Sequence, residues 1–153
     1  MNIKKEYIEK TKEYLEDLRK RITRKENLQI EIEMLMERQR IEGGISFGDG
    51  IKSKGSYRGI EDLIITYDAQ ITNKKSESER IDHHLRMYEV YSRSLSNFDK
   101  NVLNLRYLES DKKISFVNIA KKLSYSKSAI ANIHDDAIET LAFYVYGEDA
   151  TYI

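Results

Sequence analysis

The sequence predicts an all-α protein, and three observations support that prediction. Charged residues make up 34% of the 153 residues, proline is absent, and helical apolar patterns flank a single glycine-rich segment. Lysine, glutamate, arginine and leucine favour helices, whereas proline is the strongest helix breaker. We therefore expect a long two-helix N-terminal module over residues 1–95 and a three-helix domain over residues 96–153.

The first predicted helix covers about Ile3 to Glu42. Apolar residues recur there at spacings of seven or fourteen, with two more on the adjoining row, as in an amphipathic helix. The residues concerned are Ile8, Leu15, Ile22 and Met36, with Leu18 and Ile32 beside them. Lys25 and Gln29 interrupt this seam, so the pattern falls short of an ideal coiled coil.

Residues 43–59, GGISFGDGIKSKGSYRG, contain six of the seven glycines. The segment has no Gly-Lys-Ser/Thr, and a predicted helix rather than a strand precedes it, so it does not match a phosphate-binding loop. Because glycine is conformationally free, we expect a flexible linker here.

The helical pattern returns from Ile60 to Leu95. One heptad row contains Ile60, Tyr67, Ile81, Tyr88 and Leu95. The neighbouring row contains Ile64, Ile71 and Leu85. Two helices of similar length joined by a loop predict either an antiparallel hairpin or an intersubunit coiled coil, and either arrangement would bury the stripe.

Three shorter helices are predicted over 98–108, 115–123 and 126–146. Ser96 or Asn97 offers a cap for the first, and Gly147 is a natural stop for the last. Between the second and third, the pattern of a helix stops at Leu123 and restarts at the capping residue Ser126. Such a short connection predicts a helix-turn-helix corner.

The residues around this corner have the sizes that a steep helix crossing requires. Ile119 and Leu123 are expected to face inward from the first helix, with the small Ala120 at the closest approach, and Ile130 and Ile133 to face back from the second. Ser124 departs from the pattern. Glycine is the usual turn residue at this place, so serine is expected to occupy it only with some strain or in a modified turn.

A helix-turn-helix that binds DNA places the start of its second helix in the major groove. The outward residues there, which we expect to read bases, are Lys127, Ser128, Ala131 and Asn132. Phosphate contacts are expected from Lys112, Lys113, Ser115, Lys121, Lys122 and Ser126, through lysine charge and the backbone N–H groups at helix starts.

The charge distribution both supports and weakens this interpretation. The formal net charge is zero, but residues 100–127 hold seven bases against two acids. A lysine-rich stretch is often only a solvated face. Asp135 and Asp136, which follow it, would repel phosphates, so we expect them either to point sideways or to discriminate against some bases.

Composition and motifs disfavour a catalyst, a cofactor or a metal site. There is no cysteine, and the adjacent His83 and His84 diverge by about 100° around a helix, so they cannot bind one ion from one face. Neither His83 nor His134 follows a glutamate at the spacing that di-iron bundles use, so all three histidines are expected at the surface. No catalytic triad context is recognisable. Without a signal peptide or membrane span, we expect a soluble, cytoplasmic protein.

The C-terminal third resembles the promoter-recognising fourth region of bacterial sigma factors. The resemblance is carried by Val102 to Tyr107 (VLNLRY), Ile119 to Leu123 (IAKKL), Ser126 and the pair Ala137-Ile138 within LSNFDKNVLNLRYLESDKKISFVNIAKKLSYSKSAIANIHDDAIETL. The whole chain is similar to phage late-operon regulators of the ArpU and RinA type, which share the corner, a glycine- and serine-rich segment between long helices, and an ending like LAFYVYG. It lacks that family's usual linker proline, and its second corner helix is poor in arginine.

The resemblance implies a sequence-specific transcriptional regulator, an activator of phage late genes that binds double-stranded DNA and contacts bacterial RNA polymerase. One corner domain has a small interface, so a homo-oligomer is expected, with a dimer favoured.

Two alternatives stay open. A phage small terminase also joins a helix-turn-helix to a helical hairpin, although it usually places the DNA-binding domain first. A helical interaction protein would make no DNA contact.

Overall fold

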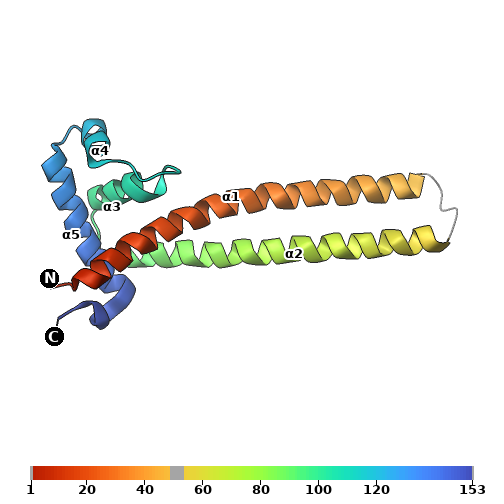
Figure 1. Cartoon of the computed structure of the whole chain (residues 1–153), viewed down its shortest axis with the longest axis horizontal. Helices are drawn as coiled ribbons and strands as arrows, with labels where there is room; N and C mark the ends of the chain where they lie inside the picture. Colours follow the sequence, from red (N-terminus) through yellow and green to blue (C-terminus); the bar gives the residue numbers. More distant parts are fainter. Residues whose placement is uncertain (1, 49–53, 153) are drawn as a thin grey trace. The chain divides into compact units, whose positions relative to one another are not determined.

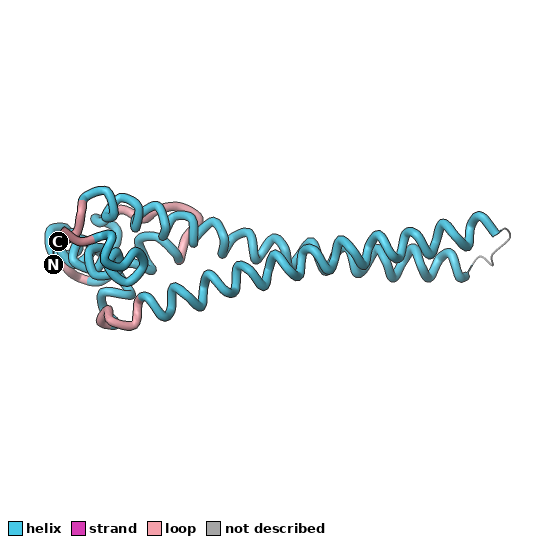
Figure 2. Tube along the Cα trace, turned by 90° about the horizontal axis from the view of Figure 1, so that it is seen from below, coloured by secondary structure: helices cyan, strands magenta, loops and turns pink. Residues whose placement is uncertain are grey.

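The computed structural model describes residues 2–48 and 54–152, with side chains described outside 44–58, and this part of the chain consists of helices joined by short loops (Figures 1 and 2). The helices are α1 (Lys5–Gly48), α2 (Lys54–Tyr91), α3 (Asn97–Leu103), α4 (Phe116–Leu123) and α5 (Lys127–Tyr146). A π-helical turn, η1 (Asn104–Leu108), follows α3, and a 3₁₀ turn, η2 (Gly147–Ala150), follows α5. The predicted all-α class, with two long helices before shorter ones, is confirmed.

Both long helices extend into the glycine-rich segment. The sequence predicted ends at Glu42 and Ile60, whereas α1 continues to Gly48 and α2 begins at Lys54. Glycine costs about 1 kcal/mol per residue in a helix relative to alanine, which weakens a helix without forbidding it. The predicted linker over 43–59 is therefore partly helical, and its remainder, residues 49–53, lies outside the described residues.

The chain divides into two compact units that do not follow the predicted boundary at residue 95. The first unit comprises Met1–Thr23 with His83–Ile153, and the second comprises Arg24–Asp82. The reason lies in the core of the first unit, where the beginning of α1 and the end of α2 pack with the shorter helices. Its buried residues are Leu15, Leu18, Tyr88, Leu95, Leu103, Tyr107, Ala137, Ile138 and Leu141.

The first unit also brings the two ends of the described chain together. The Lys4 N–H donates to the Ala150 carbonyl at 2.8 Å, and Ile3 and Thr151 form an isolated antiparallel bridge. Ile3, Ala142 and Ala150 form a small buried cluster beneath this bridge. The start of α1 is thereby fixed to the end of α5.

The second unit is an antiparallel hairpin of α1 and α2, one of the two arrangements that the sequence predicted. Successive partners run in opposite directions along the helices, since Gln39 binds Asp68 at 2.6 Å and the Tyr67 hydroxyl donates to Glu42 at 2.8 Å. Nearer the other end of the hairpin, Lys25 pairs with Asp82. This ion pair explains how a lysine sits at a position that interrupts the apolar seam.

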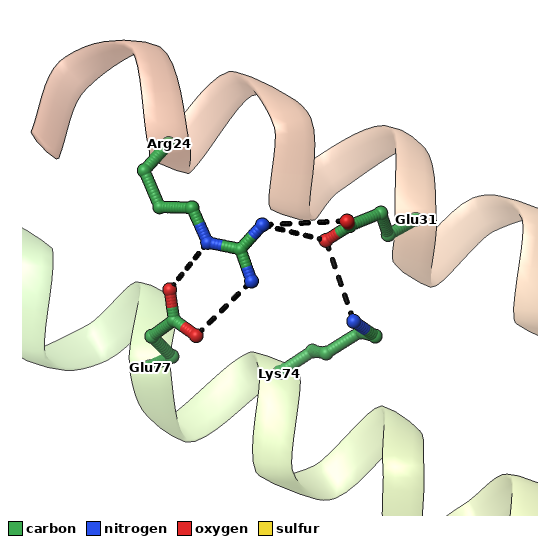
Figure 3. Close-up of polar contacts among 4 residues, drawn as sticks. All are labelled: Arg24, Glu31, Lys74 and Glu77. Carbon is green, nitrogen blue, oxygen red and sulfur yellow. Dashed lines mark hydrogen bonds and ion pairs between the residues drawn. The ribbon is translucent and has the colours of Figure 1, made fainter. Parts of the chain in front are cut away.

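An ion-pair network fixes the register of the hairpin at Arg24 (Figure 3). The guanidinium donates to Glu77 of α2 through Nε at 2.6 Å and Nη2 at 3.2 Å, and through Nη1 to Glu31 of α1 at 3.1 Å. Lys74 of α2 reaches the same Glu31 at 3.4 Å. The hydrogen bond from Arg24 holds the pKa of Glu77 below its ordinary value.

The prediction that one apolar row of the first helix is buried is confirmed for Leu15 and Leu18. It is wrong for Met36, which is 42% exposed. A straight α-helix drifts by about 20° per heptad from a strict seven-residue repeat, so a residue four heptads from Ile8 has turned away by about 80°. Leu28, which is off that row, is buried instead.

Candidate nucleic-acid interface

The predicted corner is formed by α4 and α5, which three residues, 124–126, connect. Behind it lies a core in which Ile119, Ala120 and Ile130 are buried, together with Val102 and Leu105. Leu123 and Ile133 pack against this core from the two sides of the corner, as the sequence predicted. The corner therefore has an inner face fixed by packing and an outer face available to solvent.

Ser124 makes the turn in the left-handed backbone region, with φ 61° and ψ 44°. It is the only non-glycine residue with positive φ in the described part of the chain, which confirms the strain predicted for a serine at this place. The turn is closed because the Tyr125 N–H donates to the Ala120 carbonyl at 3.0 Å. The same carbonyl also accepts from the Ser124 N–H, so both residues after the end of α4 are bound to its last turn.

Two serines cap the helices of the corner. The Ser115 hydroxyl accepts from the Asn118 N–H at 3.2 Å, and the Ser126 hydroxyl accepts from the Ala129 N–H at 3.1 Å. Both side chains are exposed, so both helix starts face solvent. A capping hydroxyl uses a lone pair and keeps its own proton as a donor. The positions predicted for phosphate contact are thus at genuine helix starts, where the helix dipole favours an anion.

The four predicted base-reading residues lie at the beginning of α5. Lys127, Ser128 and Asn132 are exposed, and Ala131 is half-buried. With about 100° between successive helical residues, these four positions fall within about 140° of one another and form one outward face. Ile130 and His134 are both buried, and each lies about 160° from Asn132 around the helix, whereas Lys127 is at the edge of the face nearest to them.

Asp135 belongs to the same outward face, in agreement with the second of the two roles expected for it. One turn beyond Ala131, its carboxylate is 67% exposed and lies 2.9 Å from His134 Nδ1. A carboxylate among base-reading positions can accept a hydrogen bond from the cytosine amino group. Asp135 is therefore part of the candidate interface rather than a bystander that points sideways.

His134 is buried, with 2% of its surface exposed, so its predicted surface location is wrong. Its Nε2 is 2.7 Å from the Tyr107 hydroxyl of η1, and its ring meets Phe116 of α4 edge-on. Because Asp135 can only accept when ionised, Nδ1 carries the proton and Nε2 accepts from Tyr107. Burial lowers the pKa of His134, against the smaller raising effect of Asp135.

The predicted phosphate-contacting lysines are exposed on two elements of the first unit. Lys121 and Lys122 lie on the last turn of α4, and Lys112 and Lys113 on the loop before it. Lys113 also lies 3.6 Å from Glu16 of α1, so part of its charge is compensated within the protein. The structure thus places all four around the corner, with Lys113 the least available of them.

Arg106 is the residue that holds this loop, and sequence reasoning counted it only as one more base. Its Nη1 donates to the Ile114 carbonyl at 2.7 Å, and its guanidinium lies 4.0 Å from the centroid of the Phe116 ring. The Ile114 N–H donates back to the Arg106 carbonyl at 3.1 Å. Arg106 therefore positions the residues just before α4, including Ser115, and is not itself directed at a ligand.

The described residues form neither a metal site nor a helix that could cross a membrane. In the ranges 2–48 and 54–152, no three histidine, cysteine, aspartate or glutamate side chains come together as metal ligands. No helix within those ranges combines the length and the apolar character that crossing a membrane requires.

Comparisons with known proteins identify no relative. The chain matches no family model, no curated protein and no solved structure.

Proposed function

We propose that this chain is a sequence-specific DNA-binding regulator of transcription. The observation that carries the proposal is the outward face at the start of α5, where Lys127, Ser128 and Asn132 are exposed while Ile130 and His134, each about 160° from Asn132 around the helix, are buried. That arrangement matches the requirement of a recognition helix, whose first turns meet base edges in the major groove.

Each residue has a role that follows from its chemistry. Lys127 donates to guanine O6 or N7, Asn132 pairs with the adenine edge through its amide, and Ser128 serves either a base or a phosphate. The half-buried Ala131 offers a methyl group to thymine. Asp135 accepts from cytosine and disfavours positions where only acceptors are present.

The surrounding groups position the domain on the DNA backbone. The lysines of α4 and of the preceding loop supply positive charge, and the capped starts of α4 and α5 present N–H groups. These contacts contribute affinity without sequence information, so they determine how strongly binding depends on salt.

The resemblance to late-operon regulators extends this proposal to activation of phage late genes in a host bacterium, with RNA polymerase as a second partner. Two copies acting together would double the contacts that one small domain makes. We include a homodimer in the proposal for that reason.

The test is an anisotropy titration against duplex fragments of the genome that encodes the chain, at two salt concentrations. We expect one fragment to bind about 10³-fold more tightly than the others. The double variant Lys127→Ala/Asn132→Ala should lose this preference and keep the weak, salt-dependent binding. The matched control Lys75→Ala/Asn73→Ala changes the same residue types at exposed positions of α2 and should behave as the unaltered chain. Equal binding of all fragments by the unaltered chain would overturn the proposal.

A further inference from the structure

The hairpin of the second unit leaves more large apolar side chains exposed than it buries. Among its described side chains, the buried apolar residues are Leu28, Ile71 and Ile81. The exposed ones are Ile30, Met34, Met36, Ile41, Leu63 and Ile65. Most of the stability of a helix in a protein comes from packing an apolar face, so a hairpin with this balance is expected to have a further packing partner.

Three of these exposed residues form a row along α1. Ile30, Met34 and Ile41 are 56%, 55% and 42% exposed, and with Asn27 and Glu37 they follow the alternating spacing of three and four residues of a coiled-coil seam. At about 100° per residue, the row lies within about 80°, and its centre is turned by about 140° from Leu28, which faces α2. Helix α1 therefore has two apolar faces, of which α2 covers one. We call the five residues the outer row.

A pocket of about 200 Å³ adjoins the outer row. Met34 and Leu35 supply its apolar wall, and Glu31, Arg38 and Lys74 surround it. An apolar side chain from an adjoining helix would find in this pocket the hole that knobs-into-holes packing requires. The outer row and its pocket thus offer a knob and a hole on the same surface, as a self-complementary two-fold interface needs.

The charges of the unit favour a second copy of the same chain as the occupant. Residues 24–82 contain 10 bases and 12 acids, so two copies approach without strong net repulsion. The two polar members of the outer row also decide the orientation. Parallel copies would place Glu37 against Glu37, whereas an antiparallel pair centred between Ile30 and Met34 places the Asn27 amide opposite the Glu37 carboxylate.

We propose that a second copy of this chain covers the outer row of α1, with the two α1 helices antiparallel about a two-fold axis near residue 32. Ile30 of one copy then packs against Met34 of the other, and Asn27 against Glu37. The proposal supplies the surface for the homodimer of the proposed function and is independent of DNA binding.

The first experiment measures the molar mass of the full chain by light scattering at micromolar concentration. We expect a dimer for the unaltered chain and a monomer of unchanged helical content for Ile30→Glu/Met34→Glu. The control Ile65→Glu places a charge at a 64% exposed position of α2 outside the outer row and should remain a dimer. A monomeric unaltered chain, a ring of many subunits, or a dimeric double variant would each overturn the proposal.

The second experiment tests the relative orientation of the two α1 helices with single introduced cysteines. Because the chain has no native cysteine, any disulfide that forms joins the introduced positions. In the antiparallel pair, positions 27 of the two copies are about 15 Å apart along the axis, beyond the reach of a disulfide. A mixture of Asn27→Cys and Glu37→Cys chains should therefore cross-link between unlike chains on mild oxidation. Cross-linking of either variant with itself alone would contradict the antiparallel arrangement.

The Lys127→Ala/Asn132→Ala variant separates this proposal from the proposed function. It should lose sequence preference and remain a dimer. A dimeric unaltered chain that prefers no DNA sequence would show that the proposed function had failed, and a monomeric unaltered chain that binds one sequence specifically would show that the present proposal had failed.

Discussion

The hydroxyl of Tyr107 and Nε2 of His134 are 2.7 Å apart in the interior of the first unit, and this hydrogen bond joins η1 to the helix that carries the candidate base-reading residues. The contact lies among the buried residues behind the corner, where Phe116 also meets the His134 ring. It fixes the rotation of α5, because His134 follows the outward Asn132 by two residues.

Removing this hydrogen bond should destabilise the protein measurably. In Tyr107→Phe, His134 Nε2 stays buried without its donor, which costs about 1–3 kcal/mol. Denaturant unfolding measures the loss directly. The control Tyr144→Phe removes a hydroxyl from a residue that is 46% exposed and should change the free energy of unfolding little. Equal effects of the two substitutions would contradict the role given to the buried pair.

The buried histidine also predicts a loss of stability in mild acid. The folded-state pKa of His134 is lowered by burial, so the unfolded chain binds its proton more readily than the folded one does. The stabilisation is complete above the unfolded pKa of about 6.5 and is lost as pH falls from there through the lowered folded pKa. Asp135 opposes the shift, whereas Arg106 and Lys12 reinforce it.

Unfolding free energies at pH 7.5 and 5.5 test this prediction, because Glu37 and Glu77, whose pKa values are lowered, titrate below that window. We expect the unaltered chain to lose stability between the two values and His134→Gln to lose less. His84→Gln serves as the control, because the pKa of the less buried His84 is also lowered by burial. The prediction is wrong if His134→Gln keeps the full pH dependence.

The turn residue of the corner offers a stabilising substitution. Ser124 holds a left-handed conformation that costs a non-glycine residue about 1 kcal/mol, so Ser124→Gly should stabilise the protein by about that amount. Ser124→Ala removes the hydroxyl and keeps the strain, so it should not stabilise. Thermal unfolding of the unaltered chain and the two variants separates the effect of the backbone strain from that of the lost hydroxyl. A glycine variant no more stable than the alanine variant would show that the turn is not strained.

The loop before α4 should depend on Arg106. In Arg106→Met the hydrogen bond to the Ile114 carbonyl is lost while an apolar side chain still covers Phe116. We expect faster amide hydrogen exchange over residues 109–115 and weaker DNA binding of all sequences alike, because the loop contributes phosphate contacts only. Lys100→Met, on α3, serves as the control for a lost positive charge.

The local features of the corner were predictable from the sequence, because each depends on residues within one turn. The caps at Ser115 and Ser126 and the left-handed turn at Ser124 belong to this class, and the structure confirms all three. The burial of His134 was not predictable in this way. It depends on Tyr107, 27 residues earlier, whose partnership leaves no local pattern.

The long helices also combine predictable and unpredictable features. Apolar periodicity predicted that both helices exist. It did not predict where the two structural units meet, because that depends on which part of α1 packs with α3 and α5 rather than with α2. The outer row was also overlooked. Its spacing is visible in the sequence, but a second apolar row on a helix stands out only once α2 is seen to cover the first.

The central claim is that the start of α5 reads bases, and site selection from a randomised duplex library tests it most directly. The unaltered chain should select a defined motif, and Asn132→Ala should select the same motif with the preference for adenine lost at one position only. The Ser124→Gly protein, altered outside the base-reading face, should select the unaltered motif. A motif that Asn132→Ala leaves unchanged at every position, or no motif from the unaltered chain, would contradict the account.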